Sequence, residues 1–281
     1  MRKFGFLLVL LVLLAACGSD PTPFPADVPV TPTVTPPPTD VPPILMGLTA
    51  ETARFIPAAE LALLRQAAQV TVLETAFNPV DIGARFDLVA GFGDLPGGTR
   101  SPVTLNAMLI ISPEAPPLNM QYGDLIRRGV DAPALVDALA VPGLAALADA
   151  PRTTPAELRT ELANVGRPDG FGLVMAVDQM PGAEQLAAQL TAFNVRTRLV
   201  PMPGEDVPAA LASGDIHLAM VRYTTPEERQ AWIDLYGQEF TVDLYALPIS
   251  VVAVLELTIT YTPGGWPLPS RGGDSVQGEG N

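Results

Sequence analysis

The chain has 281 residues, with 16 basic against 30 acidic side chains and a formal net charge of −14. This balance argues against binding of nucleic acid, whose phosphate backbone requires a dense array of Lys and Arg. The sequence holds one Lys (Lys3), one His (His217) and one Cys (Cys17). These counts exclude zinc clusters, disulfide frameworks, Cys–His pairs and, beyond the first residues, Schiff-base and P-loop chemistry.

The first seventeen residues have the pattern of a bacterial lipoprotein signal. A short positive start, Met1-Arg2-Lys3, precedes an apolar run from Phe4 to Ala16, which is shorter than the ~20 residues that a membrane-spanning helix needs. Leu14-Ala15-Ala16-Cys17 resembles the lipobox, in which the Cys is lipidated and the chain is cut before it. We predict a signal peptide over residues 1–16, a covalent lipid on Cys17 as the sole cofactor, and an extracytoplasmic protein anchored to a bacterial membrane. The alternatives are an ordinary signal peptide with an incidental Cys, or an uncleaved anchor.

Residues 17–43 are predicted to form a linker after the lipidated Cys. From Asp20 to Pro43 the chain contains ten Pro and five Thr. Because Pro fixes φ and lacks an N–H donor, this composition favours an extended polyproline II conformation of ~3.1 Å per residue. We expect a semi-rigid stalk; a ligand for a Pro-binding module is the alternative.

From Ile44 onward, short apolar strands alternate with helices in two similar units. The first helix is expected to begin after Thr49 as N-cap and to bury Phe55, Ala59, Leu63 and Ala67. Strands are expected over residues 44–48, 70–73 and 85–90 in the first unit, and over 171–177, 196–202 and 215–223 in the second. Helices of the second unit are expected over residues 182–193 and 207–212. Such alternation predicts an α/β fold with parallel strands and right-handed crossovers.

Two such units predict two lobes with separate sheets and a cleft between them. We assign the first lobe to residues 44–102, the second lobe to 103–269 and a disordered tail to 270–281. The second range also contains a strand over 103–112, a helical stretch over 124–139, a helix from the N-cap Thr154 to Val165, a helix opened by Thr224 to Glu227, and a β-rich stretch over 240–262 that is broken at Pro248.

Three stretches resemble the C-terminal half of bacterial extracellular solute-binding proteins of the dipeptide and oligopeptide type. They are Val130 to Val136, Leu158 to Phe171 (LRTELANVGRPDGF) and Leu211 to Ala219 (LASGDIHLA). The resemblance covers roughly residues 103–250. It implies a two-lobed, type 2 periplasmic-binding-protein-like fold that closes on a ligand by hinge motion. It also implies capture of a small solute, peptide-like or amino-acid-like, for an ABC importer, by a monomer whose partner is a permease.

The sequence departs from this family in two places. Family members have a far larger N-terminal lobe, and the Trp often found after the last strand of the second unit is replaced by Arg222-Tyr223. A second function therefore stays open beside transport, that of a binding-protein-like domain serving as a sensor or surface interaction module. Catalysis is not expected, since the sequence has no Gly-x-Ser-x-Gly elbow and a triad would have to centre on His217, which is predicted to be a core residue inside a strand.

Ligands of open α/β sheets lie beyond the carboxyl ends of the strands. That rule selects six candidate ligand-binding residues: Thr49, Gly93, Asp94, Asp178, Arg222 and Tyr223. The Arg222 guanidinium could hold a carboxylate bidentately, and Gly93 and Asp94 across the cleft could hold an amine, so a zwitterion is the expected solute. The alternative for Arg222 is a surface ion pair with Glu227 or Glu228. Phe92 is expected either in the ligand-facing loop with Gly93 or in the core, Trp232 in the core, and Trp266 as a lid or the cover of a turn.

Overall fold

The computed structural model describes residues 42–74 and 76–271. The predicted signal peptide, the lipidated Cys17, nearly all of the linker and all but the first two residues of the tail lie outside these ranges. The described part belongs to one compact unit that begins at Pro42. None of its helices has the length and apolar character needed to cross a membrane.

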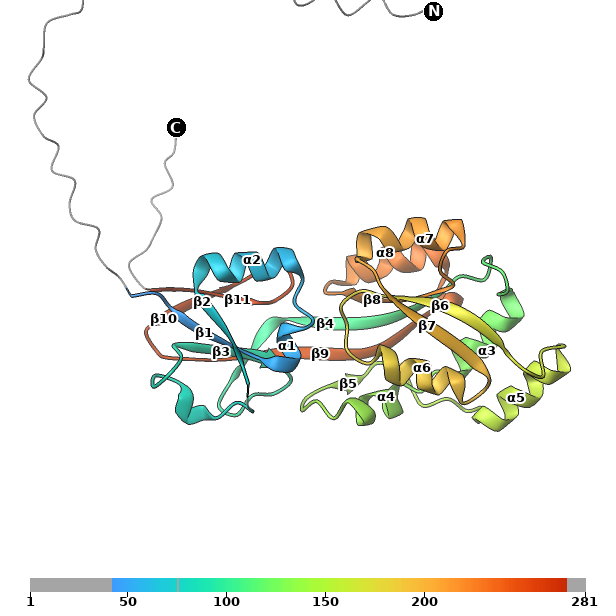
Figure 1. Cartoon of the computed structure of the whole chain (residues 1–281), viewed down its shortest axis with the longest axis horizontal. Coiled ribbons are helices and arrows are strands. Elements are labelled where there is room, and N and C mark those ends of the chain that lie inside the picture. The colour runs from blue at the N-terminus through green and yellow to red at the C-terminus, as the bar shows by residue number, and fades with distance from the viewer. Residues whose placement is uncertain (1–41, 75, 272–281) are drawn as a thin grey trace, which may run out of the picture. The chain divides into compact units, whose positions relative to one another are not determined.

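Helices and strands alternate along the described chain, as the sequence predicts (Figure 1). The α-helices are α1 (Ala50–Ala53), α2 (Ala58–Ala67), α3 (Met120–Gly129), α4 (Ala132–Leu139), α5 (Pro155–Asn164), α6 (Ala183–Thr191), α7 (Val207–Ser213) and α8 (Pro226–Tyr236). The strands are β1 (Leu45–Thr49), β2 (Gln69–Leu73), β3 (Leu88–Phe92), β4 (Thr99–Ile111), β5 (Ala145–Ala146), β6 (Phe171–Val177), β7 (Val195–Pro201), β8 (Leu218–Tyr223), β9 (Thr241–Ala253), β10 (Leu257–Tyr261) and β11 (Pro267–Arg271). Three short 3-10 helices cover Pro79–Asp81, Gly204–Asp206 and Gln238–Phe240.

The two predicted units have the same internal topology, which confirms the repeat. The main sheet has the strand order β2-β1-β3-β9-β4-β8-β6-β7, with β5 pairing to β9. β1 is parallel to β2 and β3, and β6 is parallel to β7 and β8. In each unit the first strand is therefore central, the second lies at the outer edge and the third lies next to the long strands β4 and β9.

The expectation of two separate sheets is wrong, because β4 and β9 join the units into one sheet. Each has 13 residues, which at ~3.3 Å per residue is ~43 Å. Both strands are long enough to run through the half of the sheet that contains β1 to β3, which we call the first lobe, and the half that contains β6 to β8, which we call the second lobe. Pro248, expected to break the strand, lies inside β9 opposite Thr104, beside a register shift between Arg100 and Thr104. The missing N–H of the proline therefore falls where the ladder is already interrupted.

The C-terminal hairpin belongs to the first lobe rather than to the second. Its strands β10 and β11 pair with each other and lie beside α2 (Figure 1). In the connecting turn, the Thr262 hydroxyl donates to Glu60 Oε2 on α2 at 3.0 Å, and the Gly265 carbonyl accepts from the Ser101 hydroxyl at 2.8 Å. Trp266 is fully buried and its ring lies 5.5 Å from that of Phe92. Trp266 is thus part of the core of the first lobe and not a lid.

Prolines account for two differences between the predicted and observed helices. The first helix is interrupted before Pro57 and restarts at Ala58, so that the buried residue of α2 is Leu64, while Leu63 is 41% exposed. The stretch over 124–139 divides into α3 and α4, with Asp131 capping α4 at the N–H of Ala134 and Pro133 in its first turn. Both changes follow from the loss of a backbone donor at Pro, which favours the first turn of a helix over its interior.

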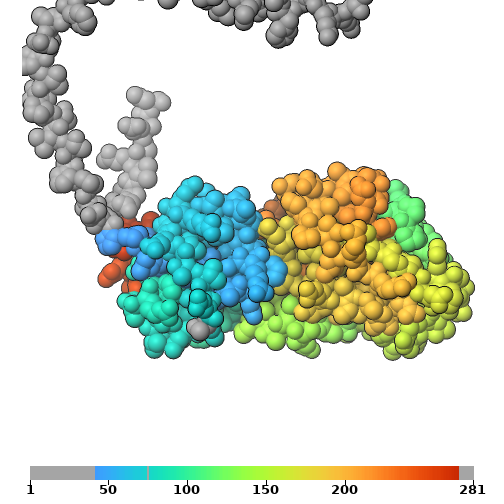
Figure 2. All heavy atoms as spheres, in the orientation of Figure 1, coloured from blue at the N-terminus to red at the C-terminus, as the bar shows by residue number. Residues whose placement is uncertain are grey.

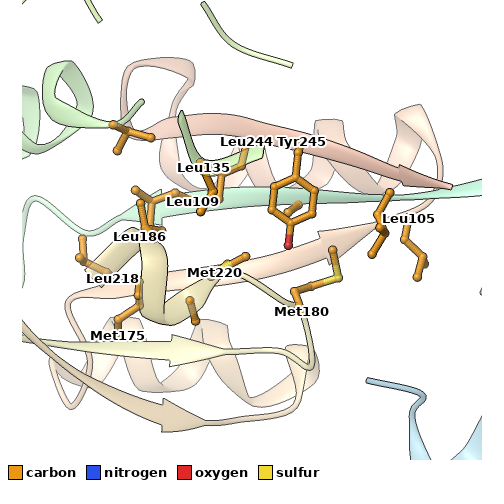
Figure 3. Close-up of a cluster of buried hydrophobic side chains, with 14 of the residues drawn as sticks. Leu105, Leu109, Leu135, Met175, Met180, Leu186, Leu218, Met220, Leu244 and Tyr245 are labelled. Carbon is orange, nitrogen blue, oxygen red and sulfur yellow. The ribbon is translucent and has the colours of Figure 1, made fainter. Parts of the chain in front are cut away.

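Helices pack on both faces of the second-lobe sheet. Figure 3 shows part of the main core, with Leu135 of α4 and Leu186 of α6 against Leu109 of β4. On the opposite face, β4 presents Met108 and Ile110 toward α7, because side chains alternate along a strand. His217 lies just before β8, where its Nδ1 accepts from the N–H of Val174 at 3.1 Å and its Nε2 lies 2.8 Å from the carbonyl oxygen of Pro116. His217 therefore has a structural role, as expected, but it is half-buried and lies outside the strand in which it was predicted.

Candidate functional site

The carboxyl ends of the parallel strands of both lobes meet where the lobes join. β1 ends at Thr49 and β3 at Phe92 in the first lobe, and β6 ends at Val177 and β8 at Tyr223 in the second. Residues of both lobes line two cavities at this junction. Figure 2 shows the surface indented where the cyan segment that contains α2 faces the orange segment that contains α8.

The first cavity, which we name the acidic cavity, has a volume of about 310 Å³. The first lobe contributes Glu60 from α2 and the turn between β10 and β11, and the second lobe contributes residues at the ends of β6 and β8, before α7 and on α8. Its lining residues are Glu60, Asp178, Gly204, Glu205, Arg222, Tyr223, Thr224, Glu228, Trp232, Pro263 and Gly264.

Asp178 is the most buried carboxylate of the acidic cavity, at 6% exposed. Its Oδ2 lies 3.5 Å from Arg222 Nε, an ion pair longer than a good hydrogen bond. Burial raises the pKa of Asp178 above its usual 3.8, against the lowering effect of Arg222, while Glu205 raises it further and the Gly204 N–H lowers it. Gly204 permits this close approach, since a Cβ there would lie 2.8 Å from Oδ2.

Two other carboxylates of the acidic cavity are each held through one oxygen. Glu60 Oε2 accepts from the Thr262 hydroxyl, and Glu228 Oε2 accepts from the N–H and the hydroxyl of Thr224, at 2.7 and 2.9 Å. Glu205 is exposed. The ring of Trp232, half-buried on α8, adds an aromatic surface to these four acids.

Tyr223 lines the acidic cavity, but its hydroxyl is already engaged. It donates to Asp243 Oδ1 at 2.9 Å, and Asp243 also accepts from Arg229 on α8, whose shortest contact is 2.6 Å. Burial is the main cause of the raised pKa of Tyr223, and the hydrogen bond to Asp243 adds to it. The phenol therefore stays protonated at neutral pH and positions α8 against β8 and β9.

The second cavity, which we name the apolar cavity, has a volume of about 620 Å³ and lies between α1 and the start of α6. Val177 lines it while the next residue, Asp178, lines the acidic cavity, because consecutive side chains of an extended chain point to opposite sides. Its lining residues are Glu51, Arg54, Phe55, Phe92, Ala138, Leu139, Val141, Val177, Met180, Pro181, Gly182, Ala183, Glu184, Gln185, Leu199 and Pro201.

Three of the six predicted ligand residues, Asp178, Arg222 and Tyr223, come together in the acidic cavity. Arg222 pairs with Asp178 and not with the expected Glu227 or Glu228. The role of Arg222 as a carboxylate ligand stays a prediction.

The other three predicted residues, Thr49, Gly93 and Asp94, line neither cavity. Asp94 forms a bidentate pair with Arg100, with both bonds at 2.7 Å, which lowers the pKa of Asp94. The Thr49 hydroxyl shares a 2.6 Å hydrogen bond with Thr52, and the N–H of Gly93 donates to the Pro248 carbonyl at 2.8 Å. The structure therefore does not place Asp94 across one cavity from Arg222.

Sequence reasoning missed Glu60, Glu205, Glu228, Trp232 and the turn at Pro263-Gly264 as lining residues. Only Glu228 had a local signal, because a Glu three residues after the N-cap Thr225 is typical of a helix start. Glu60 and Gly264 are about two hundred residues apart in the chain, and only the packing of the hairpin on α2 brings them together.

No family model and no curated protein matches the chain. Solved structures do match. The periplasmic binding protein DppA from Helicobacter pylori, in complex with the peptide STSA, is 12% identical, with a TM-score of 0.47 over 72% of this chain and 55% of that one. OppA from Haemophilus influenzae, in complex with RPPGFSPFR, is 10% identical, with a TM-score of 0.45 over 67% and 54%. NikA from Staphylococcus aureus, in complex with Ni(L-His)2, is 10% identical, with a TM-score of 0.44 over 70% and 59%.

The predicted resemblance to solute-binding proteins is thus also a resemblance to solved structures, at low sequence identity. The DppA structure is described as that of a periplasmic binding protein associated with an ABC transporter. The chain spans a little more than half of the length of the solved proteins that it matches.

Proposed function

We propose that the protein is an extracytoplasmic solute-binding protein that captures a small solute at the junction of its lobes for an ABC importer. One observation carries the proposal. Two units of identical topology direct the carboxyl ends of their parallel strands toward one junction, where two cavities are lined from both lobes. Ligands of open α/β sheets bind at such strand ends, and the long strands β4 and β9 that run through both lobes can bend as a hinge.

A ligand screen followed by cavity-filling variants tests this proposal. Peptides, amino acids, sugars and anions are screened by thermal shift, and hits are measured by calorimetry. Ala138→Trp fills the apolar cavity from an exposed position of α4, and Pro263→Trp fills the acidic cavity from an exposed turn. Ala134→Trp, one helical turn before Ala138 and also exposed, is the matched control.

We expect one of the two filling variants to lower the affinity for the solute at least ~10-fold, the loss of ~1.4 kcal/mol of binding free energy. The control variant should bind as the wild type does. The proposal fails if no solute binds, or if a solute binds equally well to all three variants.

The predicted lipid anchor is part of the proposal and depends on the sequence, since Cys17 lies outside the described residues. Cys17 is the single thiol of the chain and follows Leu14-Ala15-Ala16. Acyl chains there would hold the protein at the outer side of a bacterial membrane, near a permease. Cys17→Ser should abolish labelling with palmitate. Undiminished labelling would contradict the anchor but would not affect the proposal of solute binding.

A further inference from the structure

We propose that the apolar cavity receives the apolar body of the captured solute, an uncharged hydrocarbon group such as an aromatic ring with a short chain. This inference rests on the proposed function and names the class of solute and the cavity that takes it. The sequence, by contrast, predicted a zwitterion held by Arg222, which lines the acidic cavity.

The lining of the apolar cavity separates hydrocarbon from charge. Eleven of its sixteen lining residues have apolar side chains, and the charged ones are Glu51, Arg54 and Glu184. These three are exposed, so they form a rim in contact with water. The volume of about 620 Å³ lies within the ~300–1,000 Å³ of ordinary ligand pockets, which are mostly apolar with a few polar groups. A ligand that fits this lining has its hydrocarbon inside and any polar end at the rim.

The apolar side chains of this cavity are incompletely covered by protein. Phe55, Phe92, Leu139 and Leu199 are each half-buried, whereas Trp266, which packs on Phe92, is fully buried. Apolar surface in contact with water is unfavourable, and patches of it on soluble proteins mark binding sites. An apolar body in the cavity removes this surface from water.

Both lobes contribute walls that suit an aromatic ring. The rings of Phe55 and Phe92, from the first lobe, have centroids 6.2 Å apart and planes tilted by 39°. The second lobe contributes Leu139 of α4, Leu199 of β7 and the flexible side chain of Met180. Aromatic rings in tilted clusters gain more than their buried area alone provides. An aromatic solute therefore fits this lining better than a sugar or an ion does.

The same lining disfavours a zwitterion inside the apolar cavity. An ammonium or carboxylate among these side chains would lose its water of hydration and gain no charged partner there, because Glu51, Arg54 and Glu184 lie at the exposed rim. Burial of an unpaired charge is strongly unfavourable. The charged ends of an amino acid or a peptide would have to stay at the rim.

A homologous series of probes tests the apolar character of the site. We would measure benzyl alcohol, 2-phenylethanol, 3-phenylpropanol and 4-phenylbutanol by calorimetry on the full chain. Each buried methylene contributes ~0.8 kcal/mol, so the affinity should rise ~4-fold with each added methylene. The heat-capacity change of binding should be negative, as burial of apolar surface requires. An affinity that stays constant along the series, or no binding of 4-phenylbutanol, would overturn the inference.

Variants assign the binding to the apolar cavity. Ala138→Trp fills this cavity from an exposed helix position and should weaken binding of 4-phenylbutanol at least ~10-fold, whereas Pro263→Trp, which fills the acidic cavity, should leave it unchanged. Val177→Thr adds a hydroxyl to the lining with little change in volume and should weaken binding ~3-fold. Val174→Thr is the matched control, because Val174 lies on the same strand and faces α7 on the opposite side. Equal effects of the two tryptophan variants, or of the two threonine variants, would overturn the inference.

The outcomes separate this inference from the proposed function. If the screen returns a sugar, an ion or a zwitterion whose binding is weakened by Pro263→Trp, and 4-phenylbutanol does not bind, the solute-binding function stands and the apolar class is wrong. If the phenylalkanols bind and Ala138→Trp weakens their binding while Pro263→Trp does not, both stand. If neither a screened solute nor a phenylalkanol binds, both fall.

Discussion

The cluster of Tyr223, Arg229 and Asp243 provides a demanding test of how the acidic cavity is held together. Arg229 on α8 donates to both oxygens of Asp243 on β9, with Nη2 2.6 Å from Oδ2 and Nε 3.1 Å from Oδ1, and Tyr223 on β8 donates to Oδ1 at 2.9 Å. No residue of α8 is fully buried. The polar cluster therefore has to contribute much of what fixes this helix, which carries Glu228 and Trp232 of the cavity.

The stability that the Arg229–Asp243 ion pair contributes follows from how far its side chains are buried. Breaking a fully buried ion pair costs ~3–5 kcal/mol, and an exposed pair contributes ~0–1 kcal/mol. The side chains of Arg229 and Asp243 are 33% and 19% exposed, between these limits. Asp243→Asn retains the shape and an acceptor for Tyr223 but removes the charge, so we expect a loss of about 2 kcal/mol in the free energy of unfolding. For a domain of about this size, that loss lowers Tm by roughly 4–8 °C.

Urea unfolding followed by circular dichroism measures this loss, and a double-mutant cycle with Arg229→Met isolates the pair. The coupling energy should be about 1–2 kcal/mol. A loss below ~0.5 kcal/mol, the range of ordinary surface substitutions, or an additive cycle would refute the reasoning.

Two further predictions concern stability. Thr154→Ala removes the N-cap hydroxyl that accepts from the N–H of Glu157 in the capping box of α5. The free energy of unfolding, measured in urea, should fall by about 1 kcal/mol. No change would mean that water replaces this hydrogen bond at no cost. The raised pKa of Asp178 means that the folded protein binds a proton there more tightly than the unfolded chain does. The wild type should therefore gain stability relative to Asp178→Asn as the pH falls through that raised pKa toward the usual 3.8. Melting curves of both proteins across this range measure the gain, and a difference in Tm that does not change with pH would contradict the prediction.

Local features of the fold could be predicted from the sequence because they depend on neighbouring residues. The strand from Phe171 to Val177 was predicted with its observed bounds, and Thr154 caps its helix as expected. Long-range pairing could not be predicted in this way. The ladder between β4 and β9 joins Leu105 to Leu247, residues far apart in the chain, and no periodicity in either strand specifies its partner.

The same limit applied to the candidate site. The rule of strand ends found Asp178, Arg222 and Tyr223, since it depends on where strands stop. It also selected Asp94, although both oxygens of this carboxylate bind the guanidinium of Arg100, six residues later in the next strand. Glu60 was missed, because it reaches the cavity only through the packing of the C-terminal hairpin on α2.

The surroundings of Arg222 differ most clearly between the prediction from the sequence and the structure. As a lone cation at a strand end, Arg222 was expected to bind an anion, and its removal would then weaken binding. In the structure it is the one guanidinium among four carboxylates, and its side chain is 26% exposed beside Asp178. Arg222→Met keeps much of the length of the side chain and removes the charge that lowers the pKa of Asp178. We therefore expect the variant to lose about 1–2 kcal/mol in the free energy of unfolding at neutral pH, between the values for exposed and for buried ion pairs. The loss should shrink as the pH falls and Asp178 takes up a proton. Urea unfolding that shows no loss, together with calorimetry that shows weaker binding of an anionic solute from the screen, would return Arg222 to the role of an anion ligand.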